Sequence, residues 1–243
     1  MIRSIALWLV MAPLALFAQS PPPVISTHIL TFAPASLPGG FQTFYRTAGN
    51  IELFTASAGT LGLPTPYTGP RLFALYGSKA DLEPPSPGQK PKPPVASVTL
   101  PINCDLVLLL CTRTADNKVG LVAYNLDSRD LKSGDYRVFN FSKSPVSMIM
   151  GDQRFALTPG KDSIVRDSKW HDETIVLPIK IATVADGKAK SVYSSFREHY
   201  SQSRTLMFLF DGKHPSRPIT FATFNADTPA PKPAAGNPVT GTP

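Results

Sequence analysis

The chain has 243 residues, 26 prolines, two cysteines and a formal net charge of +7 at pH 7. This length is sufficient for one large or two small domains. Two cysteines are too few for a small disulfide-stabilised scaffold, and the scattered basic residues disfavour a nucleic-acid-binding patch.

The first 18 residues are typical of a secretory signal peptide. Arg3 supplies the positive charge, residues 5–17 form a short apolar segment, and Ala18 is a small residue at the expected cleavage point. The apolar segment is shorter than the roughly 20 residues that span a bilayer, and no later segment approaches that length. We therefore expect an exported protein, periplasmic or extracellular, without a transmembrane segment in its mature form.

The rest of the sequence predicts an all-β protein. Short runs rich in Val, Ile, Thr, Phe and Tyr are separated by Gly, Pro, Asp and Asn, a pattern typical of strands and turns. No segment has the apolar periodicity and caps of a helix, and we expect residues 196–203 to form a loop. The expected strands are 42–46, 51–55, 71–76, 96–100, 106–112, 119–125, 136–141, 146–150, 154–157, 163–166, 174–184, 189–195, 205–210 and 219–225.

The sequence also contains an internal repeat. Residues 106–127 match residues 206–227 without a gap at an offset of 100, and residues 41–64 match residues 136–159 at an offset of 95. Positions 106–110 and 206–210 are apolar throughout, whereas a half-exposed strand would alternate. We expect one face of each strand to lie in its own sandwich and the other against the second repeat. The alternative is that the long insertions of the two repeats cover the second face of each strand.

These patterns predict two tandem antiparallel β-sandwich-like units from an internal duplication, with one continuous sandwich as the alternative. The expected parts are a signal peptide (1–18), a first repeat (24–128), a second repeat (129–227) and a disordered Pro-rich tail (228–243). A Pro-rich insertion at 83–94 in the first repeat is expected to be an extended surface loop, because proline donates no ladder hydrogen bond. The second repeat is expected to carry an extra hairpin at 179–196, turned at Asp186-Gly187.

Residues that could bind a metal are present, but not in a metal-binding pattern. Cys104 and Cys111 would lie roughly 23 Å apart on an extended strand, with side chains on opposite faces, so we expect two buried thiols. Asn125 and Asp127 end one predicted strand and recur 100 residues later. We interpret them as turn formers, because two oxygen ligands are too few for a cation site.

No catalytic, nucleotide-binding or metal-binding motif is present, so we predict no catalytic residue, no metal site and no cofactor. The cluster Trp170-His171-Asp172-Glu173 is the densest group of polar residues. Consecutive residues of an extended chain point to opposite faces, so we interpret it as an exposed loop anchored by Trp170. An acid/base or metal site is the alternative.

The candidate binding residues lie in a second polar cluster. They are Arg197, His199, Tyr200 and Arg204, between the expected hairpin and the strand at 205–210. Arginine and tyrosine are favoured at interfaces, which makes a recognition loop possible. A surface turn with a local ion pair is the alternative.

Several turns of the second repeat carry a resemblance. The segments 134–142 (Gly-Asp-Tyr-Arg-Val-Phe-Asn-Phe-Ser), Pro145-Val146, Gly151-Asp152 and 157–160 (Leu-Thr-Pro-Gly) resemble exported bacterial proteins of unknown function built from tandem β-sandwich repeats. The resemblance covers mainly residues 129–227. It implies an envelope or extracellular β protein, and it implies no catalytic residues.

The sequence thus favours an exported, non-catalytic protein for binding, adhesion or scaffolding at the cell envelope. One alternative is an envelope-polymer hydrolase with its site between the repeats. Another is a structural subunit that assembles through a strand edge. The candidate partners are an anionic envelope polymer, which the positive charge would attract, or another envelope protein. No feature points to nucleic acid.

Overall fold

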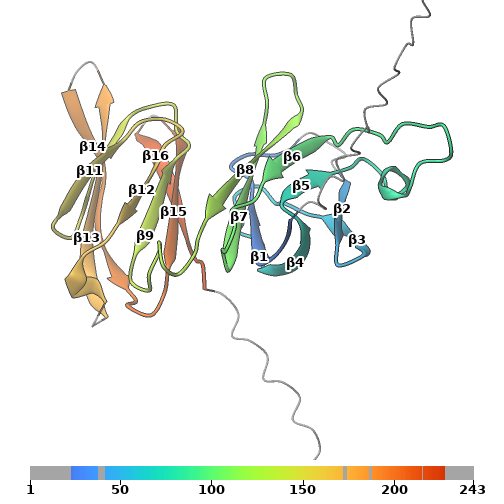
Figure 1. Cartoon of the computed structure of the whole chain (residues 1–243). Coiled ribbons are helices and arrows are strands. Elements are labelled where there is room, and N and C mark those ends of the chain that lie inside the picture. Colours follow the sequence, from blue (N-terminus) through green and yellow to red (C-terminus); the bar gives the residue numbers. More distant parts are fainter. Residues whose placement is uncertain (1–22, 38–41, 172–173, 186–187, 215, 228–243) are drawn as a thin grey trace, which may run out of the picture.

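The structure, a computed structural model, describes residues 23–37, 42–171, 174–185, 188–214 and 216–227 (Figure 1). In these ranges the chain forms strands β1 to β16 and two short 3₁₀ helices, η1 (Lys79–Leu82) and η2 (Ser168–Trp170). The predicted all-β, sandwich-like fold is therefore confirmed. No helix among the described residues is long and apolar enough to cross a membrane.

The first half of the chain forms two sheets. Its inner sheet has the order β4 (Thr65–Pro70), β1 (Val24–Phe32), β7 (Leu106–Arg113) and β8 (Val119–Asn125). Its outer sheet is made of two hairpins. They are β2 (Thr43–Thr47) with β3 (Asn50–Phe54), and β5 (Leu72–Leu75) with β6 (Ala96–Thr99). A single pair of residues, Phe44 and Tyr76, joins the two hairpins.

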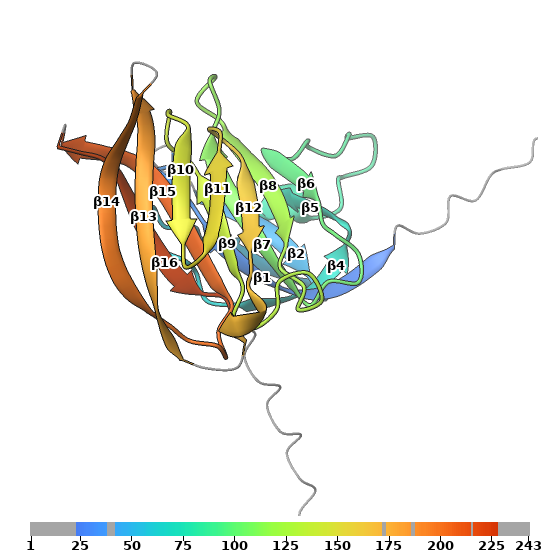
Figure 2. The ribbon, with the colours of Figure 1, turned by 90° about the vertical axis from the view of Figure 1, so that its left-hand side faces the viewer.

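The second half also forms two sheets. Its inner sheet has the order β12 (Asp162–Val165), β9 (Tyr136–Asn140), β15 (Thr205–His214) and β16 (Arg217–Asn225). Its outer sheet has the order β11 (Gln153–Leu157), β10 (Val146–Met150), β13 (Ile175–Ala185) and β14 (Lys188–His199). Figure 2 shows this outer sheet in front.

The two halves share one order of strands. In each, the first strand pairs in parallel with the seventh, the second and third form a hairpin, and the fifth and sixth form another. By this order, β13–β14 is the counterpart of β5–β6. The expected hairpin at 179–196 therefore exists, but it has a counterpart in the first half and is not an addition to the second. The Pro-rich segment 83–94 lies in the connection between β5 and β6, which corresponds to that between β13 and β14. The duplication itself stays a prediction.

The expected offset of 95 residues is wrong. It matched residues 136–139 to residues 41–44, but Tyr136 begins β9, the counterpart of β1. The hairpins β2–β3 and β10–β11 correspond at an offset of 103, from Thr43 to Val146 and from Asn50 to Gln153. The offset of 100 places β7 on β15 and β8 on β16, but the registers of the two pairs differ by two residues, since Val107 pairs with Asn125 whereas Met207 pairs with Thr223.

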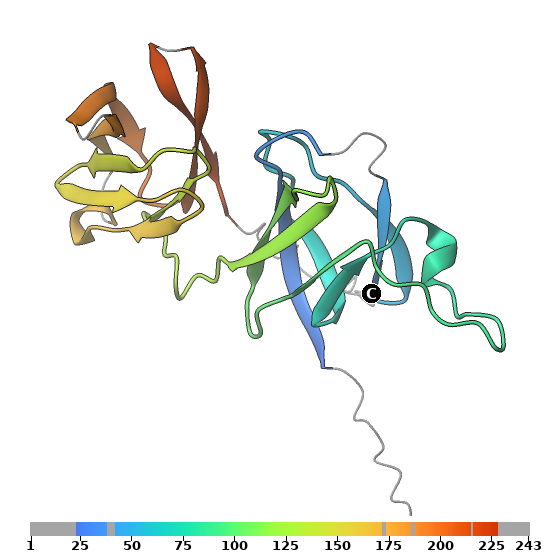
Figure 3. The same ribbon diagram turned by 90° about the horizontal axis from the view of Figure 1, so that it is seen from above.

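The four sheets stack as layers around three cores, with the two inner sheets face to face in the middle (Figures 1 and 3). Val107 and Leu109 of β7 lie in the core of the first sandwich. Leu106 and Leu108 point to the opposite face, into a central core that both halves share. Strand β15 alternates in the same way. Both faces of β7 and β15 are thus buried by their own sandwich and by the other half, which confirms that prediction.

Aromatic stacking fills the central core. The rings of Phe32 and Phe208, from opposite halves, are stacked with centroids 4.0 Å apart, and Phe139 lies 5.0 Å from Phe208. Two arginines of the second half bond to backbone of the first. Arg204 Nη1 donates to the Leu126 carbonyl at 2.7 Å, and Arg137 Nη1 donates to the Asn125 carbonyl at 2.6 Å. These contacts join the two sandwiches into one packed unit.

Every strand predicted from the sequence is present, and two further strands, β1 and β4, were not predicted. Pro66 and Pro70 lower the strand propensity of β4, which can hold them because it is the edge of its sheet. The expectation of purely antiparallel sheets is corrected, since β1–β7 and β9–β15 are parallel. The expected loop at 196–203 is partly wrong, because β14 continues to His199.

Some predictions fall outside the described residues. These are the signal peptide at 1–18, the Pro-rich tail at 228–243, the turn at Asp186-Gly187, and the acids of the cluster at 170–173. Cys104 and Cys111 lie within the described part and are buried free thiols, as predicted.

Candidate functional site

The outer sheets of the two halves differ in how completely their hairpins join. In the second half, β10 and β13 pair over five residues, from Val146 to Met150. Among the described residues of the first half, Phe44 and Tyr76 are the one pair that joins β2 to β5, through two backbone hydrogen bonds of 2.9 Å. The first outer sheet is therefore closed at one end and open at the other.

The next residues along this open seam are Arg46 on β2 and Ala74 on β5. The backbone N–H and C=O groups of every second residue point toward the same neighbouring strand. The backbone groups of Arg46 and Ala74 therefore point toward each other, as the backbone groups of Phe44 and Tyr76 do. No backbone hydrogen bond joins Arg46 to Ala74 in the described structure, whereas their counterparts Ile149 and Lys180 are paired. We call the gap between Arg46 and Ala74 the window.

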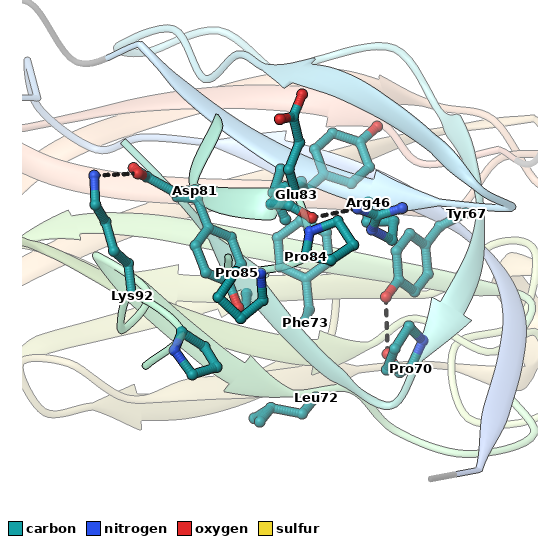
Figure 4. Close-up of a pocket in the computed structure, with 15 residues that line it drawn as sticks. Arg46, Tyr67, Pro70, Leu72, Phe73, Asp81, Glu83, Pro84, Pro85 and Lys92 are labelled. Atoms are coloured by element: carbon teal, nitrogen blue, oxygen red, sulfur yellow. Dashed lines mark hydrogen bonds and ion pairs between the residues drawn. The ribbon is translucent and has the colours of Figure 1, made fainter. Parts of the chain in front are cut away.

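A cavity of about 360 Å³ lies at the window (Figure 4). Its walls come from β2, β4 and β5 and from the segment after β5. The lining residues are Tyr45, Arg46, Tyr67, Pro70, Leu72, Phe73, Ala74, Tyr76, Asp81, Leu82, Glu83, Pro84, Pro85, Pro91 and Lys92. The volume falls within the range of small-molecule sites, roughly 300–1,000 Å³.

Three buried aromatic side chains form the floor of this cavity. The ring of Phe73 lies 5.2 Å from that of Tyr45 and 5.4 Å from that of Tyr67, measured between centroids. A second cavity, of about 270 Å³, lies toward β1 and β3 and shares Tyr45 and Phe73 as lining. The first sandwich thus contains two hollow regions with a common aromatic wall.

The Pro-rich segment is attached over the window. The guanidinium of Arg46 donates to the carbonyl of Leu82 at the end of η1. Asp81, just before the segment, and Lys92, near its end, form an ion pair of 2.6 Å between Nζ and Oδ1. The intervening prolines at 84, 85 and 91 line the cavity. The predicted surface loop therefore also forms one side of a hollow that reaches the buried rings of Tyr45, Tyr67 and Phe73.

The corresponding positions of the second sandwich are aliphatic. The strand registers give the equivalent residues of the two halves. Met148 is equivalent to Tyr45, Val165 to Tyr67, and Ile179 to Phe73. All three are buried in the second core. The aromatic cluster is thus a difference between the halves rather than a requirement of their common fold.

Tyr45, Tyr67 and Asp81 of the cavity have pKa values that are shifted further away from neutral pH. Burial, together with the nearby Tyr45, raises the pKa of Tyr67 to about 12. Burial and then Glu52 raise the pKa of Tyr45. The hydrogen bond from Lys92 lowers the pKa of Asp81. None of these groups is tuned toward pH 7 as a general acid or base would be.

The four candidate residues from the sequence do not form one site. His199 is fully buried, with Nε2 2.8 Å from the Trp170 carbonyl and Nδ1 3.2 Å from the Tyr136 hydroxyl. Arg204 is also buried and bonds to the first half. Both side chains therefore hold core elements together. Arg197 and His199 lie on β14 rather than on the expected loop.

The other two candidates, Arg197 and Tyr200, line a cavity of about 130 Å³ at the edge of the second sandwich. Arg197 packs over the Phe221 ring, 5.3 Å from its centroid. The Tyr200 hydroxyl donates to Glu198 at 2.6 Å, which raises the pKa of Tyr200. This hollow is far smaller than the window cavity, and its polar groups are bonded to one another.

The Trp170 cluster has the anchoring role expected of it. Trp170 lies in η2 and is 2% exposed, within the second core. His171 Nδ1 is 2.7 Å from the Ser133 carbonyl, and Nε2 is 3.5 Å from the buried carboxylate of Asp135. Neither His171 nor His199 lines any of the three cavities, so the convergence of histidines that would favour an enzyme is not found in the described residues.

One group of potential metal ligands lies at the start of β7. Ligand atoms of Cys104, Asp105 and Asp127 are within 4.8 Å of one another. Asp127 accepts hydrogen bonds from Arg129 Nε and Nη2, which lower its pKa to about 2. Its backbone N–H donates to Asn125 Oδ1 at 2.7 Å, which confirms the predicted turn. The carboxylate of Asp127 is therefore already neutralised by a protein cation.

Neither cysteine is expected to react with a thiol reagent while the protein is folded. The reaction needs a thiolate, and burial raises the pKa of Cys111 to about 12 and also raises that of Cys104. Titration with 5,5′-dithiobis(2-nitrobenzoic acid) at pH 8 should detect two thiols in denaturant and none in buffer. A fast reaction of the native protein would mean that one thiol is accessible.

Neither protein-family profiles nor curated protein sequences show a match to this chain. The function must therefore be argued from the geometry of the molecule itself.

Proposed function

We propose that this protein is a non-catalytic binding protein whose ligand site is the window cavity of the first sandwich. The observation that carries this proposal is the single pair of residues joining β2 to β5, where the second half has five. A seam left open over a cavity forfeits hydrogen bonds and packing, which natural cores rarely do without a functional reason.

The chemistry of the lining supports binding rather than catalysis. Tyrosine, phenylalanine and proline dominate the cavity, and it has no serine, cysteine or histidine side chain among its lining residues. The hydroxyl of Tyr67 donates to the Pro70 carbonyl at 2.8 Å, and Asp81 is paired with Lys92. A nucleophile with an adjacent base is the arrangement that covalent catalysis needs, and these contacts do not supply it.

The hydrolase alternative gains no support from the junction of the halves, where it would place its site. Leu106, Leu108 and Phe208 fill that region and are 0% exposed. The window, which lies on the other side of the first sandwich, is the better candidate for ligand contact.

Export to the periplasm or beyond is part of the proposal and rests on the pattern of residues 1–18. N-terminal sequencing of the protein from a fractionated host tests it. A mature chain beginning at or near Gln19 in the exported fraction supports export, whereas an intact Met1 in the cytoplasmic fraction contradicts it.

Binding at the window is tested by amide NMR with three small probes of different chemistry. The probes are indole, methyl α-glucoside and octanoate, each titrated into the full mature chain. We expect at least one of them to shift the amides of Arg46, Phe73 and Ala74 saturably. The counterpart amides of Ile149 and Lys180 in the closed second sandwich serve as the internal control. If all three probes leave the window amides unchanged at millimolar concentration, the proposed function is wrong.

A further inference from the structure

We propose that the window admits a single aliphatic chain of an amphipathic molecule, which passes the aromatic wall into the inner cavity while its polar head stays at the mouth. This inference rests on the proposed function and assigns the class of ligand. Three independent features of the first sandwich support it.

The first feature is the exposure of apolar side chains around the two cavities. Leu72, at the mouth of the window cavity, is 57% exposed, and Leu53 and Leu63, at the inner cavity, are 50% and 85% exposed. Single exposed leucines are common on protein surfaces. These three all line hollow regions of the same sandwich, where an apolar ligand would cover them and remove their surface from water.

The second feature is that four of the seven polar side chains lining the window cavity are bonded within the protein, the other three being Tyr45, Tyr76 and Glu83. Arg46 donates to Leu82, Tyr67 donates to Pro70, and Asp81 is paired with Lys92. A saccharide presents many hydroxyls, each of which costs free energy when it is buried without a partner. An alkyl chain has no such requirement. The facing backbone groups of Arg46 and Ala74, at the mouth, are suited to bond one polar head.

The third feature is the shape of the hollow. The window cavity and the inner cavity are separated by Tyr45 and Phe73, which line both and whose ring centroids are 5.2 Å apart. A bulky fused-ring ligand would have to displace both rings. A slender chain requires a smaller displacement, chiefly of Tyr45, which lies on the hairpin β2–β3. Among the described residues one pair joins this hairpin to β5, while its turn is bonded to Thr68 of β4.

The chemistry identifies a chain with a polar head, which a free fatty acid and a lysophospholipid share. The two sources differ in the head, so the experiment includes both. We suggest isothermal titration of the full mature chain with hexanoate, octanoate, decanoate and dodecanoate below their aggregation concentrations. Decanoyl lysophosphatidylcholine provides the second head group.

Affinity is expected to rise with chain length. Each methylene removed from water should tighten binding roughly fourfold, the ratio that corresponds to about 0.8 kcal/mol per CH₂. Equal affinity of decanoate and its lysophospholipid would show that the chain alone is recognised. A clear preference for either would identify the source, and both results support the proposed class.

The variant Ala74→Trp should block entry, because Ala74 is half-buried and lines the window. We expect at least a tenfold loss of decanoate affinity. The matched control is Lys180→Trp, at the corresponding exposed position of β13, where the seam is closed. It should bind as the wild type does. If Ala74→Trp does not fold, Leu72→Asn with the control Val176→Asn repeats the comparison at two exposed positions without adding a charge that could pair with the carboxylate.

Three outcomes would overturn the inference. Affinity could be independent of chain length, Ala74→Trp could fold and bind decanoate normally, or the alkyl probes could fail while indole or the glucoside shifts the window amides. The last outcome leaves the window as a binding site and refutes only the ligand class. Failure of every probe refutes the proposed function as well, so the two failures are distinguishable.

Discussion

Replacing Phe208 by aspartate is expected to abolish folding of the whole chain. Phe208 is 0% exposed and stacks on Phe32 of the other half at 4.0 Å. Truncation of a buried phenylalanine alone costs about 3–5 kcal/mol, and a buried carboxylate without a partner adds several more. The total is comparable with the entire stability of a typical protein, about 5–15 kcal/mol. Leu108→Asp, on the facing strand β7, should have the same effect.

Circular dichroism and thermal melting of the purified variants test this expectation. The control is Phe196→Asp, because Phe196 lies on the outer sheet of the second half and is 71% exposed. The control should melt close to the wild type, while Phe208→Asp should show no cooperative transition. A near-normal melt for Phe208→Asp would mean that the inner sheets are not packed together in solution.

A fragment that ends at Ser128, and so contains only the first sandwich, is expected to lose its monomeric state. Removing the second half exposes Leu30, Phe32 and Leu108 at once, on one face of the inner sheet. Contiguous apolar patches of this kind drive association. We expect aggregation or self-association of the fragment, strong binding of a hydrophobic dye, and little or no soluble monomer.

Size-exclusion chromatography with light scattering distinguishes these states. Co-expression with residues 129–227 is the matched control, because the second half supplies the missing partner face. The pair should elute as a stable one-to-one complex if the central core drives the association. A soluble, cooperatively melting monomer of the fragment alone would contradict the role assigned to the central core.

Composition and patterning were sufficient to predict every strand except β1 and β4, and the stacking of the two halves. An apolar residue at every position of 106–110 and 206–210 has one simple physical meaning, which is burial of β7 and β15 on both faces. The central core satisfies it. The strands β8 and β10 were predicted with the bounds that the structure has, because a turn flanks each at both ends.

The correspondence between the halves was harder to predict, for a physical reason. Aromatic pairs such as Phe41 with Tyr136 suggested an offset of 95, but the side chains that occupy one position of a sheet need share only size and burial. Strand β1 pairs in parallel with β7 across most of the first half, and a pairing at that separation leaves no local signal. The hairpin β13–β14 was consequently assigned as an addition.

The candidate site was missed from the sequence, although a signal for it exists. With the register known, Tyr45, Tyr67 and Phe73 stand where the second half has methionine, valine and isoleucine. Aromatic residues are common in cores, so their presence alone indicates nothing. Their concentration in one of two equivalent cores is informative, but it becomes visible only once the strands are correctly matched. The four polar residues chosen from the sequence were conspicuous because they are charged or aromatic, and two of them lie in the core.

The parallel pairing of the first strand with the seventh also constrains the order of folding. His28 pairs with Leu106, and Arg137 pairs with Leu206, so each inner sheet must wait for a strand near the end of its half. Pairings between distant segments are slow, because the loop between them must be closed before any contact forms. During synthesis from the N-terminus, β1 has no partner on its β7 side until most of the first half has emerged. Each inner sheet therefore stays incomplete until its half has almost fully emerged, which is the interval in which the half can be held unfolded by another protein.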